Sequence, residues 1–486
     1  MSMLTQRKNL NAQLGMNYEL GKNQSLGFRY DYAGRHATFH TSSTSSYYAD
    51  RTLSETLETQ NYQKLRDKKH RVNAYYTAFF NERWSVDVNF DQLTGSNKRR
   101  QTVDETGRPS SLRKLHTFNR TNDYLYAYKI VAGYKASLFE MKAGHEFSFI
   151  SQKNKYTNEE DKLPSSDNRI KDRKASAFVS VAYSPGRFSL NAGLRYEHAV
   201  YDYFDRGQFI PGQSRVYDRF YPDLSLSYTL KPLGISLSYS EKTKRPYFYQ
   251  LRNDIQYNDR FSYETGNPAL QPQIQRYLNL RVGYGPLLFH LGYTNIHDYI
   301  AFTTKPYPGD ERITLFWVKN YPKFQSLNLM LSYSPVWGVW EPSFSIYLDK
   351  PSFSMDRSRG EVSLKQATGT FYWENMLRLP GGFIFTLDMD YATRGNWDVY
   401  ANKQQGGVDA GIRRSFLKNT LDVNIQGFDL FKTRRTFNTM YGEAADFSRW
   451  NYNDRRQVRL TVTYRFNATR STYKGTGAAK EEINRL

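Results

Sequence analysis

The chain has 486 residues, no cysteine, and a net charge of +21 from 68 Lys and Arg against 47 Asp and Glu. The missing cysteines exclude disulfide scaffolds, thiolate zinc sites, iron–sulfur clusters and thiol nucleophiles. An aromatic content of 16% excludes wholesale disorder, because disordered chains lack the aromatic and β-branched residues that build a core. No apolar run reaches the length of about 18 residues that a transmembrane helix needs.

Apolar and polar residues alternate along most of the chain. The clearest runs have an apolar residue at every second position and cover residues 188–196, 224–228, 235–239, 278–284, 327–333, 383–391 and 458–466. Residues at i and i+2 lie on one face of a strand, so each run has one apolar and one polar face. Helical periodicity is weak, and the sequence therefore predicts an all-β chain.

Nine short turns alternate with nine long polar stretches. The long stretches cover residues 36–68, 96–122, 152–172, 202–218, 244–275, 304–312, 349–362, 395–406 and 434–455. This rhythm predicts about nineteen strands of roughly ten residues, with short connections at one end and long ones at the other. It is typical of an antiparallel transmembrane β-barrel with short periplasmic turns and long extracellular loops. We expect this barrel over residues 1–466 and a polar carboxy-terminal tail over 467–486.

The alternation also predicts which way side chains face in such a barrel. Leu226, Leu280, Leu329 and Leu460 should face lipid, while Ser227, Arg281, Asn328 and Arg459 should face inward. Aromatic residues flank the short turns, where they predict a girdle at the lipid–water boundary. Tyr183, Tyr284 and Tyr333 precede such turns, and Phe188 and Phe383 follow them.

Two stretches resemble a known family. Lys244-Arg245-Pro246-Tyr247 is followed by Tyr263-Glu264-Thr265-Gly266-Asn267-Pro268-Ala269-Leu270-Gln271-Pro272 and then by a strand. This order resembles the barrel signature of TonB-dependent outer-membrane receptors, carried by Arg245, Pro246, Gly266, Asn267, Pro268, Leu270 and Pro272. The end of the chain, from Tyr452 through Arg456 into the strand that reaches Phe466, resembles the outer-membrane β-barrel subgroup of that family.

The resemblance implies a 22-stranded barrel in the outer membrane, plugged by an amino-terminal domain. It implies import of scarce nutrients with energy from the TonB complex. We find no plug domain, energy-coupling box or signal sequence before the strands begin, and an odd strand count would start the chain outside the cell. We therefore expect the carboxy-terminal barrel portion of such a receptor, incomplete at the amino end, which reaches the TonB complex through the missing plug domain.

Catalytic and metal-binding patterns are sparse. None of the eight His residues has the spacing of a helical metal motif, and no nucleophile elbow or phosphate-binding loop occurs. Asp388 and Asp390 alternate with apolar residues and should be solvated in a polar lumen. We expect neither an enzyme nor a bound metal or cofactor. The alternatives to a transporter are a barrel that displays adhesive or structural loops, and a barrel enzyme with its site at the rim.

The basic excess falls on the polar strand faces and in loops. Arg195, Arg281, Arg413, Arg459 and Arg465 are predicted to face the lumen, where they could contact a plug or attract anionic substrates. Loop cations such as Lys98, Arg99 and Arg100 could pair with lipopolysaccharide phosphates at the membrane surface. Nucleic acid is disfavoured as a partner, because the aromatic residues lie on the opposite face from the arginines.

Aromatic residues in and beside the long loops are the candidate substrate contacts. They are Tyr203, Tyr299, Trp397, Tyr400 and Trp450. Such rings could stack on sugars, aromatic chelators or peptides, and packing against one another is an equal alternative. The sequence leaves the substrate open among small molecules, siderophores, peptides and glycans.

Overall fold

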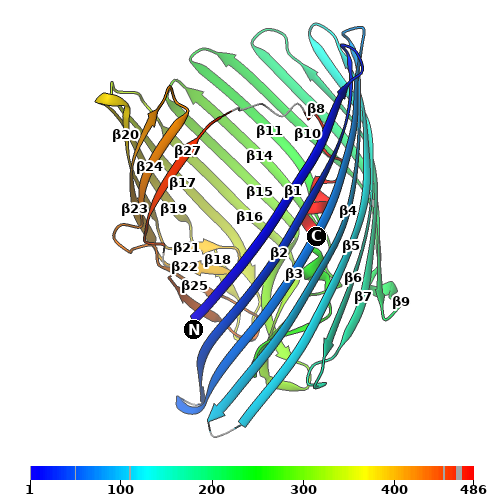
Figure 1. Cartoon of the computed structure of the whole chain (residues 1–486), viewed down its shortest axis with the longest axis vertical. Coiled ribbons are helices and arrows are strands. Elements are labelled where there is room, and N and C mark those ends of the chain that lie inside the picture. The colour runs from blue at the N-terminus through cyan, green and yellow to red at the C-terminus, as the bar shows by residue number, and fades with distance from the viewer. Residues whose placement is uncertain (1, 50, 109–110, 453–454, 467–472) are drawn as a thin grey trace.

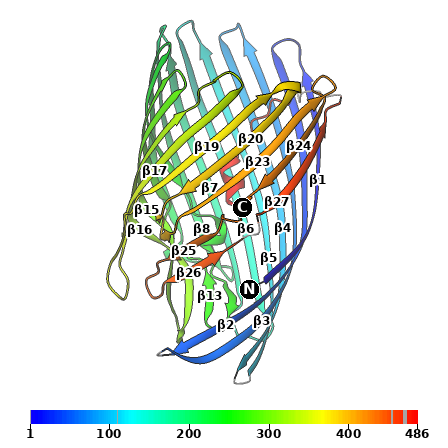
Figure 2. The same cartoon turned by 90° about the vertical axis from the view of Figure 1, so that its left-hand side faces the viewer.

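The structure is a computed structural model that describes residues 2–49, 51–108, 111–452, 455–466 and 473–486. Antiparallel strands form one large curved sheet that surrounds a lumen (Figures 1 and 2). This arrangement confirms the predicted all-β, barrel-type fold. No helix in these ranges is long and apolar enough to cross a membrane.

The main sheet has 23 strands, and four of these are short strands within loops. The remaining nineteen are long strands, each antiparallel to the one before, so the predicted count is confirmed in the described part of the chain. The short ones are β9 (Gln208–Phe209), β12 (Ile255–Asp259), β13 (Ser262–Thr265) and β18 (Val362–Leu364). The long ones are β1 (Ser2–Glu19), β2 (Gln24–Ala49), β3 (Thr52–Phe80), β4 (Trp84–Arg108), β5 (Ser111–Lys135), β6 (Phe139–Asn158), β7 (Ser166–Tyr183), β8 (Phe188–Asp205), β10 (Arg215–Leu230), β11 (Leu233–Lys244), β14 (Gln273–Tyr284), β15 (Leu287–Tyr307), β16 (Asp310–Tyr333), β17 (Trp340–Met355), β19 (Thr368–Leu379), β20 (Phe383–Ala392), β23 (Gln405–Phe416), β24 (Leu421–Phe428) and β27 (Gln457–Tyr464).

Strand lengths differ from the prediction. The polar stretch 36–68 is not a loop, because β2 and β3 pair through it with lengths of 26 and 29 residues. The stretches 96–122 and 304–312 likewise belong largely to paired strands. The regular apolar alternation is interrupted in these outer parts, where single residues such as Leu57, Leu65, Val103 and Leu115 are still buried, while backbone pairing continues. The expectations of ten-residue strands and of long loops at these three places were therefore wrong.

A row of leucines crosses seven strands in register. It consists of Leu190, Leu226, Leu237, Leu280, Leu291, Leu329 and Leu348, each directly opposite the next. Leu460 on the last long strand lies opposite Ile425. Most of the neighbouring positions are polar, with Met330 and Gly292 as exceptions, and Ser227 donates a hydrogen bond to Ser236 over 3.0 Å. The register thus agrees with the predicted lipid-facing and inward-facing sets.

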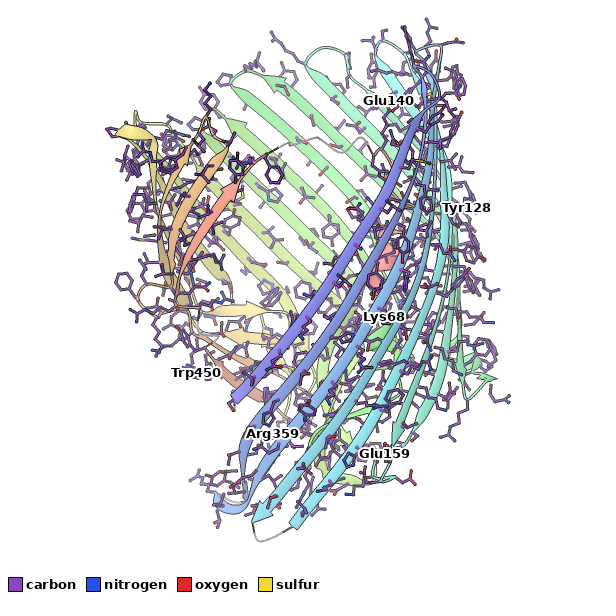
Figure 3. The ribbon with its side chains drawn as sticks, viewed as in Figure 1. Lys68, Tyr128, Glu140, Glu159, Arg359 and Trp450 are labelled. Carbon is purple, nitrogen blue, oxygen red and sulfur yellow. The ribbon has the colours of Figure 1, made fainter. Side chains whose placement is uncertain are left out.

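Aromatic rings project from the outer side of the sheet. Tyr128 on β5 points outward in Figure 3 and stacks on Phe147 of β6 at 5.8 Å. At the short-turn end, where Glu140 lies, Tyr183, Tyr284 and Tyr333 are all exposed. Glu159 and Arg359 mark the opposite, long-loop end in the same view. These positions agree with the predicted aromatic girdle.

The sheet has two edge strands in the described part of the chain. β1 pairs only with β2, and β27 pairs only with β24, so the ladder does not close between them (Figure 1). Eighteen antiparallel steps separate the two strands, because nineteen strands follow one another. β1 and β27 therefore run in the same direction, as the odd count predicts.

Two segments fold into the lumen rather than lying outside it. One is the long loop 245–272, which contains the short helix η2 (Phe248–Leu251), β12 and β13. The other is the end of the chain, residues 473–486, with helix α1 (Lys480–Arg485), which lies inside the curved sheet in Figures 1 and 2. The sequence predicted this end only as a polar tail; residues 467–472 and 453–454, the latter within a family-like motif, fall outside the described residues.

A small second sheet caps the long-loop end near β19 to β24. It comprises β21 (Gly395–Trp397), β22 (Tyr400–Asn402), β25 (Thr436–Met440) and β26 (Phe447–Asn451). Met440 and Val399 pack with Phe353 and Tyr321 into a buried cluster beneath this sheet. The two remaining short helices are η1 (Pro211–Gln213) and η3 (Pro380–Gly382).

Candidate functional site: a charged wall and its docked segment

A heavily charged part of the lumen is built on neighbouring strands. Glu146 on β6 lies opposite Ser176 on β7, which in turn lies opposite Glu197 on β8. Lys174 and Asp172 follow at i−2 and i−4 on β7, so strand alternation places them on the same face. We call the following set the charged wall: Lys129, Glu146, Asp172, Lys174, Arg195, Glu197 and Arg245.

Arg195 lies at the centre of this wall. Its guanidinium donates to Glu146 and to Ser176 over 2.6 Å each, and it lies 3.6 Å from Glu197. Lys129 approaches the other oxygen of Glu146 at 2.9 Å. The Glu146 carboxylate is thus shared by two cations, which fixes Arg195 in the lumen as a structural charge.

Arg245, the first residue of the family-like motif, is buried at 7% exposure against this wall. It forms an ion pair with Glu197 and lies 3.5 Å from Glu481 of the chain end. The carbonyl of Pro246 accepts a hydrogen bond from Nε of Arg485 over 3.1 Å. The Arg-Pro pair therefore joins the barrel wall to the end of the chain.

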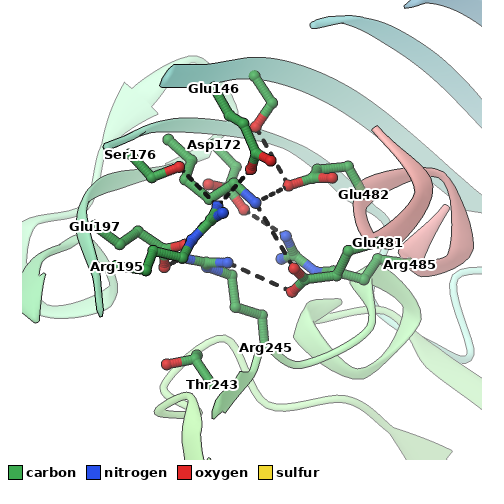
Figure 4. Close-up of polar contacts among 12 residues, drawn as sticks. Glu146, Asp172, Ser176, Arg195, Glu197, Thr243, Arg245, Glu481, Glu482 and Arg485 are labelled. Carbon is green, nitrogen blue, oxygen red and sulfur yellow. Dashed lines mark hydrogen bonds and ion pairs between the residues drawn. The ribbon is translucent and has the colours of Figure 1, made fainter. Parts of the chain in front are cut away.

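Residues Tyr473–Leu486, which we call the docked segment, complete the network (Figure 4). Lys174 forms an ion pair with Glu482 and lies 3.7 Å from Glu481. Arg485 lies 2.7 Å from Asp172, and its guanidinium lies 4.7 Å above the ring of Phe248. All of these charges are held in pairs, as buried charges require.

The amino-terminal half of the docked segment is held by its main chain. The amides of Thr476 and Gly477 donate to Oδ1 of Asn89 over 3.0 and 3.2 Å. The amides of Ala478 and Ala479 donate to Oδ2 of Asp91 over 2.6 and 3.0 Å. Two side chains of β4 thus accept four successive backbone hydrogen bonds.

The second family-like motif supports the same region. Gly266 lies so close to the carbonyls of Gln250 and Arg252 that an added Cβ would meet them at 2.5 and 2.6 Å. The amide of Asn267 donates to the Gln250 carbonyl over 2.6 Å, and Leu270 is buried at 2% exposure. Pro272 and Pro246 line one small cavity together with Arg485. Arg245, Pro246, Leu270 and Pro272 of the two motifs therefore lie beside the docked segment. Gly266 and Asn267 instead contact the loop around Gln250.

The other predicted lumen arginines lie outside this network. Arg413 and Arg465 share Asp422 at 3.2 and 2.5 Å, near the short-turn end of β23 and β24. Arg459 lies 4.7 Å above the Phe428 ring, and Arg281 lies opposite Ser236 and His290. Only Arg195 of the five belongs to the charged wall.

The predicted aromatic contacts divide into buried and exposed rings. Tyr203 lies on β8 and is fully buried in the lumen core. Tyr299 stacks on Phe324 at 4.5 Å, and Tyr400 packs against the cluster under the small sheet. Trp397 on β21 is 68% exposed, and Trp450 on β26, labelled in Figure 3, is 61% exposed.

Sequence reasoning missed most of the charged wall and all of the docked segment. The polar strand faces carry Glu146, Asp172, Lys174 and Glu197. The alternation indicates that these residues face the lumen, but it does not indicate that they form one cluster. The chain end gave no signal, because its partners lie more than 200 residues away in the sequence. Among the described residues no group of three His, Asp or Glu side chains is placed to hold a metal ion.

The curved sheet, its aromatic outer face and its charged lumen define a large outer-membrane β-barrel. The chain belongs to the outer membrane protein beta-barrel family, whose model matches residues 127–464. A comparison with curated proteins gives no match. The fold is also that of solved outer-membrane receptors and transporters.

Solved structures agree with this fold at low sequence identity. The FrpB iron transporter from Neisseria meningitidis (F5-1 variant) matches with a TM-score of 0.55 and 14% identity, over 95% of this chain and 82% of that chain. The Serratia marcescens hemophore receptor HasR, in complex with its hemophore and heme, gives 0.50 and 13% over 94% and 80%. The copper transporter OprC gives 0.51 and 12% over 89% and 76%.

Proposed function

We propose that this chain forms the barrel portion of a TonB-dependent receptor that imports a nutrient across the outer membrane. The observation that carries this proposal is a lumen lined by fixed ion pairs, inside a sheet with the fold of named transporters. An adhesive barrel needs stable loops but has no need for buried charges along its interior. A pathway for polar cargo does need a polar lining.

The proposed partners follow from the membrane and the family. Lipid and lipopolysaccharide surround the apolar face, and a plug domain would couple the barrel to the TonB complex. The substrate classes that we propose to test are small molecules and siderophores first, then peptides and glycans. Iron, heme and copper enter this list because they are named for the similar structures.

The experiment compares cells with and without the gene, and cells whose TonB complex is inactivated. Uptake of labelled iron chelates, heme and copper complexes is measured with each as the limiting nutrient. Loss of one uptake activity in both the deletion and the TonB-deficient strain is expected. Unchanged uptake of every class, glycans and peptides included, would contradict the proposal.

A second candidate function is a barrel that displays adhesive or structural loops without import. It is favoured by Trp397 and Trp450, two large rings held open to solvent on the small sheet at the long-loop end. The double variant Trp397→Ala/Trp450→Ala separates the two functions. Under the import proposal it changes the apparent affinity for the nutrient, whereas under the display alternative it lowers surface binding of cells and leaves uptake unchanged.

A further inference from the structure

We propose that the charged wall, together with Asn89 and Asp91, is a peptide-binding site that the docked segment occupies in the folded chain. The peptide it fits has an acidic pair followed by an arginine three residues later, here Glu481, Glu482 and Arg485. This inference goes beyond the import proposal and does not depend on it.

The first argument is recognition of the main chain. Asn89 and Asp91 accept the four successive amides of residues 476–479, a pattern that reads a peptide backbone rather than its side chains. The Asp91 carboxylate is prearranged, because Arg71 lies 3.1 Å from it and Asn73 donates to it over 2.9 Å. Asp91 is fully buried, so the site offers its oxygen only to the bound segment and these neighbours.

The second argument is charge complementarity. The charged wall carries four cations and three carboxylates, and the docked segment contacts it through Glu481, Glu482 and Arg485. These ten groups together have no net charge, whereas Lys474 and Lys480 of the segment stand outside this set. Lys174 is 5% exposed, and both of its ion-pair partners in the described structure belong to the docked segment. A buried ammonium without a carboxylate is strongly disfavoured, so a segment that covers Lys174 has to supply the carboxylate, as Glu482 does here.

The third argument is that the segment owes its shape to the site. Helix α1 has six residues, far below the length of about 12–15 residues at which isolated helices become even marginally stable. Ala479 is fully buried among residues of β4 to β8 and the loop 245–272, and Ile483 and Leu486 pack against the same cluster. The wall therefore selects the helical conformation of the peptide.

The first test asks whether the segment is docked on the charged wall when the protein is in the outer membrane. The chain has no native cysteine, so Asn89→Cys/Thr476→Cys places the only two thiols at a direct contact. The matched control is Val88→Cys/Thr476→Cys, because Val88 is the next residue on β4 and faces the other side of the sheet. In outer membranes from cells that produce the whole protein, a short thiol cross-linker should join the first pair at least tenfold faster than the control pair. Equal rates would overturn docking.

The second test asks whether the wall recognises a peptide in trans. The tethered segment competes with an added peptide at an effective concentration on the order of millimolar. The test therefore uses the whole protein with Glu482→Lys, because repulsion between the new lysine and Lys174 should release the tethered segment. A fluorescent peptide of residues 473–486 should bind this variant at least tenfold more tightly than it binds the unaltered protein. Its control peptide carries Glu482→Lys and should not bind.

A reciprocal variant guards against misfolding. Lys174→Glu should abolish cross-linking of the docked segment, and Lys174→Glu/Glu482→Lys should restore it, because the ion pair is re-formed with reversed charges. Failure of the native-sequence peptide to bind the Glu482→Lys protein would overturn peptide recognition, even where cross-linking shows that the tethered segment docks. Equal binding of the two peptides would overturn the charge pattern.

Discussion

Leu329 is the sixth of the seven leucines in the row and lies opposite Leu291 and Leu348. Its replacement by arginine puts a charge at the lipid-facing midplane, where the cost is about 2–4 kcal/mol. We expect Leu329→Arg to lower the free energy of unfolding from bilayers by that amount, that is, to destabilise the barrel. Urea titration in lipid vesicles measures the change. Asn328→Arg is the matched control, because the neighbouring residue faces the lumen and its charge can be solvated. Equal losses for both variants would contradict the assigned faces.

Asp398 forms part of the turn between β21 and β22, outside the membrane-spanning strands. Burial raises the pKa of its carboxyl, although a hydrogen bond from Tyr299 lowers that pKa in part. A raised pKa in the folded chain means that the protonated form is favoured there, so the turn loses stability as the pH rises through this pKa. The small sheet should therefore be more stable in acid than at neutral pH.

The variant Asp398→Asn tests this pH dependence. Asn also tolerates the left-handed backbone of this residue, which has a φ of 56°, and it keeps an oxygen for the Tyr299 hydroxyl. We expect the variant to protect residues 395–402 from hydrogen exchange better than the unaltered chain at pH 7, after correction for intrinsic rates. The two proteins should become equal at about pH 3, below the ordinary pKa of Asp. A difference that persists unchanged in acid would contradict the assignment.

At the scale of elements, the inward loop 245–272 depends on a single close approach. Gly266→Ala would drive a Cβ against the carbonyls of Gln250 and Arg252, and backbone oxygens cannot move aside cheaply. We expect a loss of about 1–3 kcal/mol, the usual cost of overpacking, and release of the loop from the docked segment. Limited proteolysis within residues 252–262 is the measurement. Gly283→Ala is the control, because open space surrounds that glycine.

The number and order of the strands could largely be predicted from the sequence, but the residues at which the strands end could not. Short turns such as 184–187 and 285–286 carry Gly and Pro beside apolar alternation, so the nineteen strands could be counted. The hairpin of β2 and β3 was misjudged because its outer half lacks an apolar face, although its backbone remains paired. A turn is specified by the residues within it, whereas pairing between two polar strands produces no pattern in either strand's own sequence.

The candidate site was less predictable for a related reason. Arg195 and the motif residues Arg245, Gly266 and Leu270 were singled out by alternation or by family resemblance. The carboxylates that pair with Arg245, those of Glu197 and Glu481, come close to it only in the folded chain. Tyr203 was assigned to a loop because its flanks are polar, yet it lies on the inward face of β8.

At the scale of the whole molecule, the two edge strands make a prediction about closure. β1 and β27 run in the same direction, so direct pairing between them would need a parallel seam, and unpaired backbone groups in hydrocarbon cost several kcal/mol each. We propose that an odd number of further strands, from preceding residues or from another chain, joins these edges. Residues 1–486 alone should fold poorly in detergent, and adding the preceding native segment should restore a heat-modifiable band on gels. A compact, protease-resistant species formed by residues 1–486 alone would contradict this.

The unequal strand lengths shape the opening of the barrel. A membrane crossing takes about 9–11 tilted residues, so β3, with 29 residues, carries its hairpin roughly 40 Å past the lipid, while β24 with 8 residues has no such excess. The rim is thus tall at β2 to β5 and low at β20 to β24, as Figure 1 shows. The upper edge of the barrel wall is therefore slanted, and the small sheet of β21, β22, β25 and β26 lies on its low side. Antibodies and phages that scan the cell surface from above should accordingly touch the tips of the β2–β3 and β4–β5 hairpins before any other part of the protein.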